Sequence, residues 1–339
     1  MRTFGFGVIG CGGIADFHID AIREIDQTSL VMVSDRKEWR GREIAEREGC
    51  LSTTQYKELL VHSKIDVVCI TTSSGSHAQI ALDVLMAGKH VLIEKPMAMT
   101  SRDAYRLLQI AKEKELTIGV VSQRRFEERL QLVKRVVQGG DLGKLLLIEV
   151  KCPYFRSQEY YDSSEWRGKI AEDGGVLMNQ GIHSIDLLLW IGGPVRCVYG
   201  KIATQTHEME AEDLGIAAIT FENGTFGTIM ASTSIQPGFA FCLNVYGEKG
   251  TIKLEGSDIV YWNVPGVPLP GTEETQVFGG GASAPLKISP QYHKLQIIDF
   301  MNSIIEGRNP AVTGEDGIRT VQLIEAIYQS SLTGLEVTI

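Results

Sequence analysis

Strand-like and helix-like segments alternate along residues 1–122 of this 339-residue chain. Apolar runs such as Phe4–Ile9 and Val67–Ile70 have the composition of buried strands, whereas Ser101–Glu115 has the apolar spacing of a helix. A chain that alternates in this way forms βαβ units with right-handed crossovers. The sequence therefore predicts an α/β domain with a parallel sheet over residues 1–122.

The pattern changes after Gln123. Most later segments read as strands, and turn sequences such as Glu222-Asn223-Gly224 separate some of them. We therefore expect residues 123–339 to form an α+β domain with a large, mostly antiparallel, open sheet. Two helical patterns, 296–306 and 317–332, end the chain, and the Gly- and Pro-rich stretch 265–290 is expected to be a long surface loop.

Composition excludes several classes of protein. The formal net charge of −9 argues against a nucleic-acid-binding protein. No apolar stretch approaches the roughly 20 residues that span a membrane. None of the six cysteines forms a Cys-x-x-Cys pair, so neither zinc-knuckle spacing nor a disulfide framework is expected. We predict a cytoplasmic protein that needs no metal for its chemistry.

A glycine-rich turn follows the first predicted strand. The segment Gly10–Ala15 fits the pattern G-x-G-x-x-A between a strand and a helix, which is the context that cradles the pyrophosphate of a dinucleotide. Asp35 ends the second strand, 20 residues beyond Ala15, where a carboxylate accepts the ribose hydroxyls of NAD. Arg36 beside it leaves NADP possible.

Other residues at the same predicted sheet edge complete the cofactor site. Thr71, Thr72 and Ser73 follow a strand and either line the nicotinamide ribose or form a plain turn. His77 opens the next helix and suits a structural role better than a catalytic one. We expect the cofactor to be contacted by Gly10, Gly12, Gly13, Ile14, Ala15, Asp35, Arg36, Thr71, Thr72, Ser73, His77, Glu94, Lys95 and Gln123.

Two segments carry groups suited to catalysis. Lys95, in Glu94-Lys95-Pro96, follows the apolar strand His90–Ile93, and proline stops that strand. Ligands bind at the carboxyl ends of such strands, so Lys95 can meet a substrate oxygen. Asn179, His183 and Asp186 are spaced by four and three, which would place them on one helical face, and a histidine there can accept a proton. The two glycines just before them, Gly174 and Gly175, are expected to leave room for a cofactor or ligand.

Together these motifs resemble the Gfo/Idh/MocA oxidoreductases over the whole chain. The resemblance implies a Rossmann domain followed by a domain with an open sheet. It also implies hydride transfer between a nicotinamide and a carbinol carbon, usually of a sugar, nucleotide sugar or cyclitol. By this resemblance Lys95 contacts the reacting oxygen, and His183 takes the acid/base position. The resemblance also implies that the Lys95–Pro96 bond is often cis.

One residue departs from the family pattern. Many members carry aspartate where this chain has Asn179, which leaves Lys95 and His183 as the acid/base pair. The segment Tyr160–Gly168 and the sequence Met178–Gln180 resemble the branch that contains UDP-N-acetylglucosaminuronate 3-dehydrogenases. The expected substrate-binding residues are Asn179, Arg156, Tyr160, Trp166, Arg167 and His293.

Two alternatives to a nucleotide-sugar dehydrogenase stay open. The first is an inositol or polyol dehydrogenase that uses the same residues. The second is a non-catalytic NAD-binding sensor, which the presence of Lys95 and His183 disfavours. The open face of the second sheet would expose apolar surface in a monomer, so we expect a homodimer or homotetramer.

Overall fold

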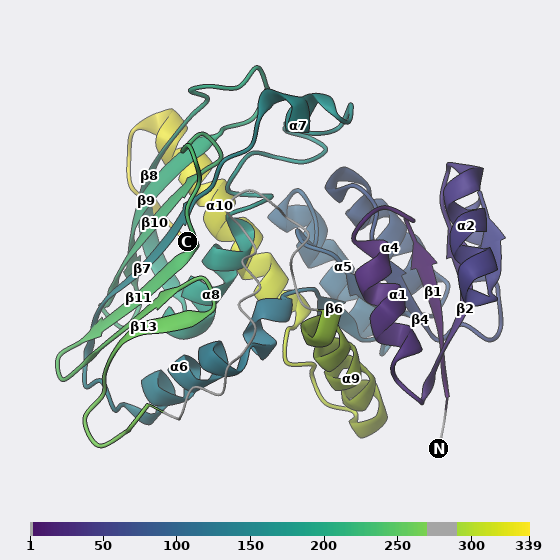
Figure 1. The fold of residues 1–339 in the computed structure, drawn as a ribbon, viewed down its shortest axis with the longest axis horizontal. Helices are drawn as coiled ribbons and strands as arrows, with labels where there is room; N and C mark the ends of the chain where they lie inside the picture. Colours follow the sequence, from purple (N-terminus) through teal and green to yellow (C-terminus); the bar gives the residue numbers. More distant parts are fainter. Residues whose placement is uncertain (1–2, 270–289) are drawn as a thin grey trace. The chain divides into compact units, whose positions relative to one another are not determined.

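The computed structural model describes residues 3–269 and 290–339 (Figure 1). It divides the chain into two compact units, which are described separately below. The first comprises Met1–Gln123 with Pro290–Ile318, and the second comprises Arg124–Ser289 with Arg319–Ile339. Most of the loop expected over 265–290 lies outside the described residues. Within the described part of the chain, no helix is long and apolar enough to cross a membrane.

The first unit contains a six-stranded parallel sheet in the order β3-β2-β1-β4-β5-β6. The strands are β1 (Phe4–Ile9), β2 (Thr28–Ser34), β3 (Leu51–Thr53), β4 (Val67–Ile70), β5 (His90–Ile93) and β6 (Ile118–Val120). Every residue of β1 and β4 is buried, which requires cover on both faces of the sheet. The strand order reverses between β1 and β4, where open α/β sheets bind their ligands. The predicted parallel sheet is confirmed.

Helices follow these strands in the predicted alternation. They are α1 (Ala15–Arg23), α2 (Glu38–Glu48), α3 (Tyr56–Leu60), α4 (His77–Met86) and α5 (Ser101–Glu113). The α5 helix begins where Thr100 Oγ1 accepts a hydrogen bond from the backbone N–H of Asp103 at 3.1 Å. This is a side-chain cap of the kind that threonine provides. The apolar face of α5 buries Ala104, Leu107 and Ala111.

Helix α9 (Pro290–Glu306) belongs to the first unit although it comes late in the chain. It packs against α1. Gln296 also ties it to the end of β6, because its amide donates to Val120 O at 2.7 Å and accepts from Ser122 N at 3.2 Å. Residues 290–318 therefore group with the first sheet, whereas the sequence led us to expect a single boundary after residue 122.

The second unit contains an eight-stranded sheet in the order β13-β12-β11-β7-β10-β9-β8-β14. Its strands are β7 (Leu145–Pro153), β8 (Val195–Ala203), β9 (Leu214–Phe221), β10 (Phe226–Ser232), β11 (Cys242–Gly247), β12 (Thr251–Glu255), β13 (Asp258–Asn263) and β14 (Val337–Thr338). Only the β7–β10 pair is parallel among these strand pairings. The predicted mostly antiparallel sheet is confirmed.

One face of this sheet is covered and the other carries exposed apolar side chains. Helix α8 (Ile182–Gly192) packs on β7 and β10, and Figure 1 shows it beside the sheet with α6 (Glu128–Gly139). The short helix α7 (Gln158–Asp162) and the long helix α10 (Gly314–Thr333) complete the elements used below. The strand registers place Tyr199, Ile216, Phe226 and Tyr261 on a common face, and each is at least 43% exposed.

Candidate functional site

The turn after β1 has the shape that a dinucleotide phosphate requires. Gly10 has a φ of +100°, and a Cβ there would lie 2.8 Å from the backbone of Thr71 and Thr72. Gly12 differs, because a Cβ at that position would meet nothing within 4 Å. The first glycine therefore allows strand-to-strand contact, and the second leaves the backbone open to a ligand.

Helix α1 begins directly after this turn. Ala15 N donates to Gly12 O at 2.9 Å, and no side chain caps the start of the helix, where the oxygens of a phosphate can bind. Ala15 is fully buried, as the third position of the motif requires for close packing of the helix on the sheet. These features fit the pyrophosphate of NAD.

Asp35 lies beside the glycine turn, as the sequence predicted for a ribose ligand. Its Oδ2 accepts a hydrogen bond from Cys11 N at 2.8 Å, and its Oδ1 accepts one from Lys37 N at 2.8 Å. The residue is half-buried, whereas Arg36 is exposed. The carboxylate is thus held by backbone donors next to the expected pyrophosphate position, where it fits the ribose hydroxyls of NAD.

The turn after β4 is tied to its neighbours by hydrogen bonds. Thr71 Oγ1 donates to Gly10 O at 2.6 Å, and Thr72 Oγ1 accepts from Ser76 Oγ at 2.7 Å. The ring of His77 contacts Pro96 O at 2.7 Å and Thr72 O at 3.1 Å, and only 1% of the residue is exposed. Burial lowers the pKa of His77. His77 therefore joins the ends of β4 and β5. This is a structural role, which the sequence favoured over a catalytic one.

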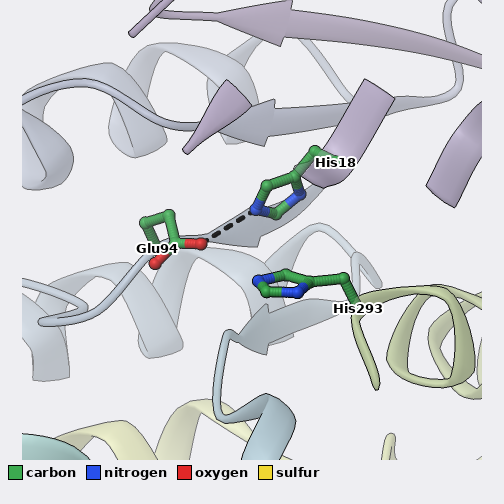
Figure 2. A group of neighbouring side chains, drawn as sticks. All are labelled: His18, Glu94 and His293. Atoms are coloured by element: carbon green, nitrogen blue, oxygen red, sulfur yellow. Dashed lines mark hydrogen bonds and ion pairs between the residues drawn. The ribbon is translucent and has the colours of Figure 1, made fainter. Parts of the chain in front are cut away.

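Lys95 follows β5 at the carboxyl edge of the sheet, one strand beyond β4. It is half-buried, and the Lys95–Pro96 peptide bond is cis. Its backbone N–H donates to Oε2 of Glu94 at 3.3 Å. The Glu94 side chain is buried and accepts a hydrogen bond from His18 Nε2 at 2.9 Å (Figure 2). His18 was not among the predicted site residues. Gln123 is also buried, at the start of a short 3₁₀ turn, Gln123–Phe126.

His183 lies in the first turn of α8 in the second unit and is half-buried. Asp186, three residues later, is 6% exposed and binds the guanidinium of Arg125 through two hydrogen bonds, Nε–Oδ2 at 2.8 Å and Nη2–Oδ1 at 2.6 Å. This fork-on-fork pairing has a fixed geometry. Asp186 therefore holds the turn that carries His183, and Arg125 supports that turn through its pairing with Asp186.

Asn179 precedes α8, because the helix begins only at Ile182. The helical spacing expected from the sequence therefore applies to His183 and Asp186 but not to Asn179. The Asn179 amide instead donates to Oδ1 of Asp173, whose Oδ2 accepts from Gly168 N at 3.0 Å. Asp173 is 1% exposed, so Asn179 is positioned by a buried carboxylate.

The glycine pair before Asn179 has a different role from the one the sequence suggested. Two glycines there could leave room for a ligand, but a Cβ on Gly175 would lie 2.0 Å from the Glu212 carboxylate. Glu212 Oε1 accepts from Leu177 N at 2.9 Å and from Tyr328 OH at 3.1 Å. Burial raises the pKa of Glu212 to about 7. The space at Gly175 is thus filled by the carboxyl group that supports the turn.

Two arginines enclose an aromatic ring in the same unit. The Arg167 guanidinium lies 4.1 Å from the Tyr160 ring centre and 4.7 Å from that of Trp166, and Arg156 lies 5.5 Å from Tyr160. The Nε atoms of both arginines are buried without a hydrogen-bond partner among the described residues. The structure therefore brings together four of the predicted substrate-binding residues, with guanidinium donors left over for an anion.

The support beneath Arg156 is a buried hydrogen-bonded pair. The His207 ring contacts Arg156 O at 2.8 Å and Asp213 Oδ2 at 3.0 Å. Burial alone would raise the pKa of Asp213, but hydrogen bonds from the backbone of Thr206 and Gln205 lower it to about 2. The ionised Asp213 thus holds His207 against the backbone of Arg156.

His293 belongs to the first unit, whereas Arg156, Tyr160, Trp166 and Arg167 belong to the second. It sits in α9 of the first unit and is 2% exposed, with its ring 5.5 Å from Phe17 and 5.4 Å from His18. Its substrate contact therefore stays a prediction without structural support, and its surroundings point to another role.

Comparison with family models matches both halves of the chain. Residues 4–122 match the model of an oxidoreductase family with an NAD-binding Rossmann fold, and residues 130–253 match the model of the GFO/IDH/MocA C-terminal domain.

Similar solved structures and sequences extend over nearly the whole chain. The WlbA dehydrogenase from Bordetella pertussis, crystallised with NADH and UDP-GlcNAcA, is 31% identical, with 100% of this chain and 99% of that chain covered and a TM-score of 0.89. The WlbA dehydrogenase from Chromobacterium violaceum, with the same two ligands, is 28% identical, with coverage of 100% and 96% and a TM-score of 0.89. Myo-inositol 2-dehydrogenase from Thermotoga maritima is 27% identical over 92% of this chain and 91% of its own length.

Proposed function

Because this chain belongs to the Gfo/Idh/MocA oxidoreductase family, we propose that it oxidises or reduces a ring carbinol of an anionic nucleotide sugar with NAD. The observation that carries the oxidoreductase part is the glycine turn with Asp35 at one sheet edge and Lys95 at the end of β5. The anionic substrate is supported by the Arg156–Arg167 pair and by the UDP-GlcNAcA bound in two similar dehydrogenases.

NAD supplies the hydride acceptor in the oxidation, and the first unit provides its binding site. The open space at Gly12 and the uncapped start of α1 suit the pyrophosphate. The Asp35 carboxylate suits the ribose hydroxyls and would repel a 2′-phosphate. We therefore assign NAD as the preferred cofactor.

Lys95 and His183 perform the acid/base chemistry in this proposal. The Lys95 ammonium stabilises the negative charge that develops on the substrate oxygen. His183 accepts the hydroxyl proton as the carbon–oxygen double bond forms and the carbon loses its hydride. In the reduction, His183 returns the proton to the oxygen. Asn179 fixes a substrate hydroxyl, and its neutral amide leaves the charge stabilisation to Lys95.

The substrate would be recognised through its anionic group and its ring. Arg156 and Arg167 hold guanidinium donors beside Tyr160, and Trp166 adds a second aromatic surface. A carboxylate or phosphate accepts from such donors, whereas an aromatic face packs against a sugar ring. An uncharged cyclitol would pack only against the aromatic faces, because it has no anionic group for the guanidinium donors.

A mutational test addresses the mechanism directly. Lys95→Ala and His183→Ala should each lower kcat by roughly 10²–10⁴-fold, while NADH still binds in a fluorescence titration. His62→Ala serves as the matched control for loss of a histidine. Normal turnover in both variants would contradict the mechanism.

A substrate panel separates the proposed function from its alternatives. UDP-sugar uronates, uncharged UDP-sugars and inositols are each incubated with NAD, and NADH absorbance is followed. Preference for myo-inositol would favour the polyol dehydrogenase, which has support from the Thermotoga maritima relative. No turnover with any substrate, together with NAD binding, would favour the sensor.

The exposed apolar side chains of the second sheet suit self-association. Tyr199, Ile216, Phe226 and Tyr261 share the face opposite the one on which α8 packs, and apolar faces of this kind are normally covered in oligomers. We therefore expect a homodimer or homotetramer. Light scattering on the purified protein measures this, and Phe226→Lys should shift the mass toward the monomer.

A further inference from the structure

Three ionisable side chains meet in the interior of the first unit (Figure 2). His18 comes from α1, Glu94 follows β5, and His293 comes from α9. Their exposed fractions are 1%, 5% and 2%. One potential ligand atom of each residue lies within 4.8 Å of those of the other two. Three distant parts of the chain thus bring their polar groups to one buried point.

The hydrogen bonds of this cluster are incomplete. His18 Nε2 and Glu94 Oε1 are 2.9 Å apart, but His18 Nδ1 and both ring nitrogens of His293 have no hydrogen-bond partner among the described residues. An unsatisfied buried polar group costs about 1–3 kcal/mol, and native proteins rarely leave several together. The cluster therefore has unused capacity to bind a further group.

The charges and ligand types favour a cation as that group. His293 offers two ring nitrogens and His18 offers Nδ1, and none of these atoms has a hydrogen-bond partner among the described residues. Glu94 adds carboxylate oxygens, one of which already lies 2.9 Å from His18 Nε2. Neutral imidazoles and a carboxylate are the nitrogen and oxygen ligands that Zn²⁺ and related ions take in proteins.

We propose that His18, Glu94 and His293 form a buried binding site for a divalent transition-metal ion of the Zn²⁺ class. The ion would join α1, the end of β5 and α9 in one coordination sphere. Three protein ligands leave the fourth position of a tetrahedral site for a water molecule. The role is structural: because Glu94 immediately precedes Lys95, the ion would fix the strand end from which the lysine projects.

The sequence contains no spacing signal for such a site, because the three ligands are far apart in the chain.

The His18–Glu94 pair also has a metal-free form. In that form a proton lies in the 2.9 Å hydrogen bond between His18 Nε2 and Glu94 Oε1. A bound metal ion would replace that proton, as metal ions do when they bind protonated ligands.

The test measures metal content and affinity rather than turnover. The full-length protein is stripped with a chelator, incubated with Zn²⁺, separated from free metal by gel filtration and analysed by mass spectrometry for zinc. We expect about one Zn²⁺ per chain. His18→Gln and His293→Gln should each weaken Zn²⁺ binding at least about tenfold, because each removes one ligand. His62→Gln, which removes a histidine elsewhere in the first unit, should bind as the wild type does.

Spectroscopy with Co²⁺ gives a second measurement. Co²⁺ bound to the wild type should show visible d–d absorption that is lost in His293→Gln and retained in His62→Gln. A wild type that retains less than about 0.1 Zn²⁺ per chain would overturn the proposal and assign a buried water to the cluster. Tight Zn²⁺ binding by both His18→Gln and His293→Gln would overturn it equally. The wild-type stoichiometry decides the question even if a variant does not fold.

Discussion

Arg125 and Asp186 form a buried, two-bond ion pair that fixes the first turns of the helix carrying His183. The two hydrogen bonds measure 2.8 and 2.6 Å, and the side chains are 4% and 9% exposed. The pair joins the 3₁₀ turn at the start of the second unit to α8. It therefore positions the turn that carries the proposed proton acceptor.

Removal of one member of this pair should be far more damaging than removal of both. Arg125→Met would leave the Asp186 carboxylate buried and unpaired, at a cost of about 3–5 kcal/mol in the free energy of unfolding. The double variant Arg125→Met/Asp186→Leu should regain most of that loss, because it buries no isolated charge. Urea denaturation of the single and double variants measures the difference. A double variant as unstable as the sum of the single variants would contradict this account.

Asp35 should decide the choice between NAD and NADP. Asp35→Asn keeps one oxygen acceptor, which can serve either Cys11 N or Lys37 N, and removes the negative charge. Loss of a charge-assisted hydrogen bond of about 1.5–3 kcal/mol should weaken NADH binding roughly 10- to 150-fold. The affinity for NADPH should fall less or rise. Fluorescence titration with both cofactors measures this, with the exposed Asp26→Asn as control. Unchanged preference in Asp35→Asn would show that another group selects the cofactor.

Arg167 should matter only for anionic substrates. Arg167→Gln removes a guanidinium that faces Tyr160 and Trp166 and whose Nε has no hydrogen-bond partner in the part of the chain that the structure describes. Loss of one charged hydrogen bond, about 1.5–3 kcal/mol, should lower kcat/KM for a UDP-sugar uronate roughly 10- to 150-fold. Turnover of an uncharged sugar should change little. The exposed Lys169→Gln controls for loss of a nearby positive charge. An equal loss for charged and uncharged substrates would indicate a structural role for Arg167.

The parts of the fold that were predictable depend on local patterns. Alternating apolar runs and amphipathic segments identified the parallel sheet, and the turn at Gly10–Ala15 with Asp35 predicted its ligand-binding edge. The start of α9 was placed too late, although Pro290 occupies the first helical position, where proline is a start signal. Helix α10 likewise begins earlier than expected, at Gly314, after a cap in which Thr313 Oγ1 accepts from Asp316 N at 3.2 Å.

The supporting contacts of the site could not be predicted from local patterns. Arg125 with Asp186, Gly175 with Glu212, and His18 with Glu94 are pairs whose members lie in different segments, and no local pattern links one member to the other. Their meaning comes from tertiary packing, which sets the distance between residues far apart in the chain. The two glycines before Asn179 illustrate this. A glycine is needed where a ligand must approach the backbone, and equally where a neighbouring carboxyl group packs against it, so the sequence alone does not distinguish the two cases.

Glu212 should make the stability of the second unit depend on pH. Its pKa is about 7 in the folded protein, because it is buried beneath Gly175, against 4.5 for an ordinary glutamate. Between these two pH values the folded state therefore binds more protons than the unfolded state. The contribution of Glu212 to the free energy of unfolding is greatest below about pH 4.5 and falls as the pH rises to about 7. The loss is on the order of 3 kcal/mol at most.

Glu212→Gln isolates this contribution from the other titrating groups. Glutamine keeps an oxygen for Leu177 N and Tyr328 OH but does not ionise. The free energy of unfolding is measured for the wild type and the variant at several pH values between 4.5 and 8, and the difference between them is plotted. The wild type should lose stability relative to Glu212→Gln as the pH rises through 7, because only the wild type must bury a carboxylate. A difference that does not vary with pH would show that Glu212 is already ionised in the folded protein at low pH, and that the space at Gly175 holds a charged group.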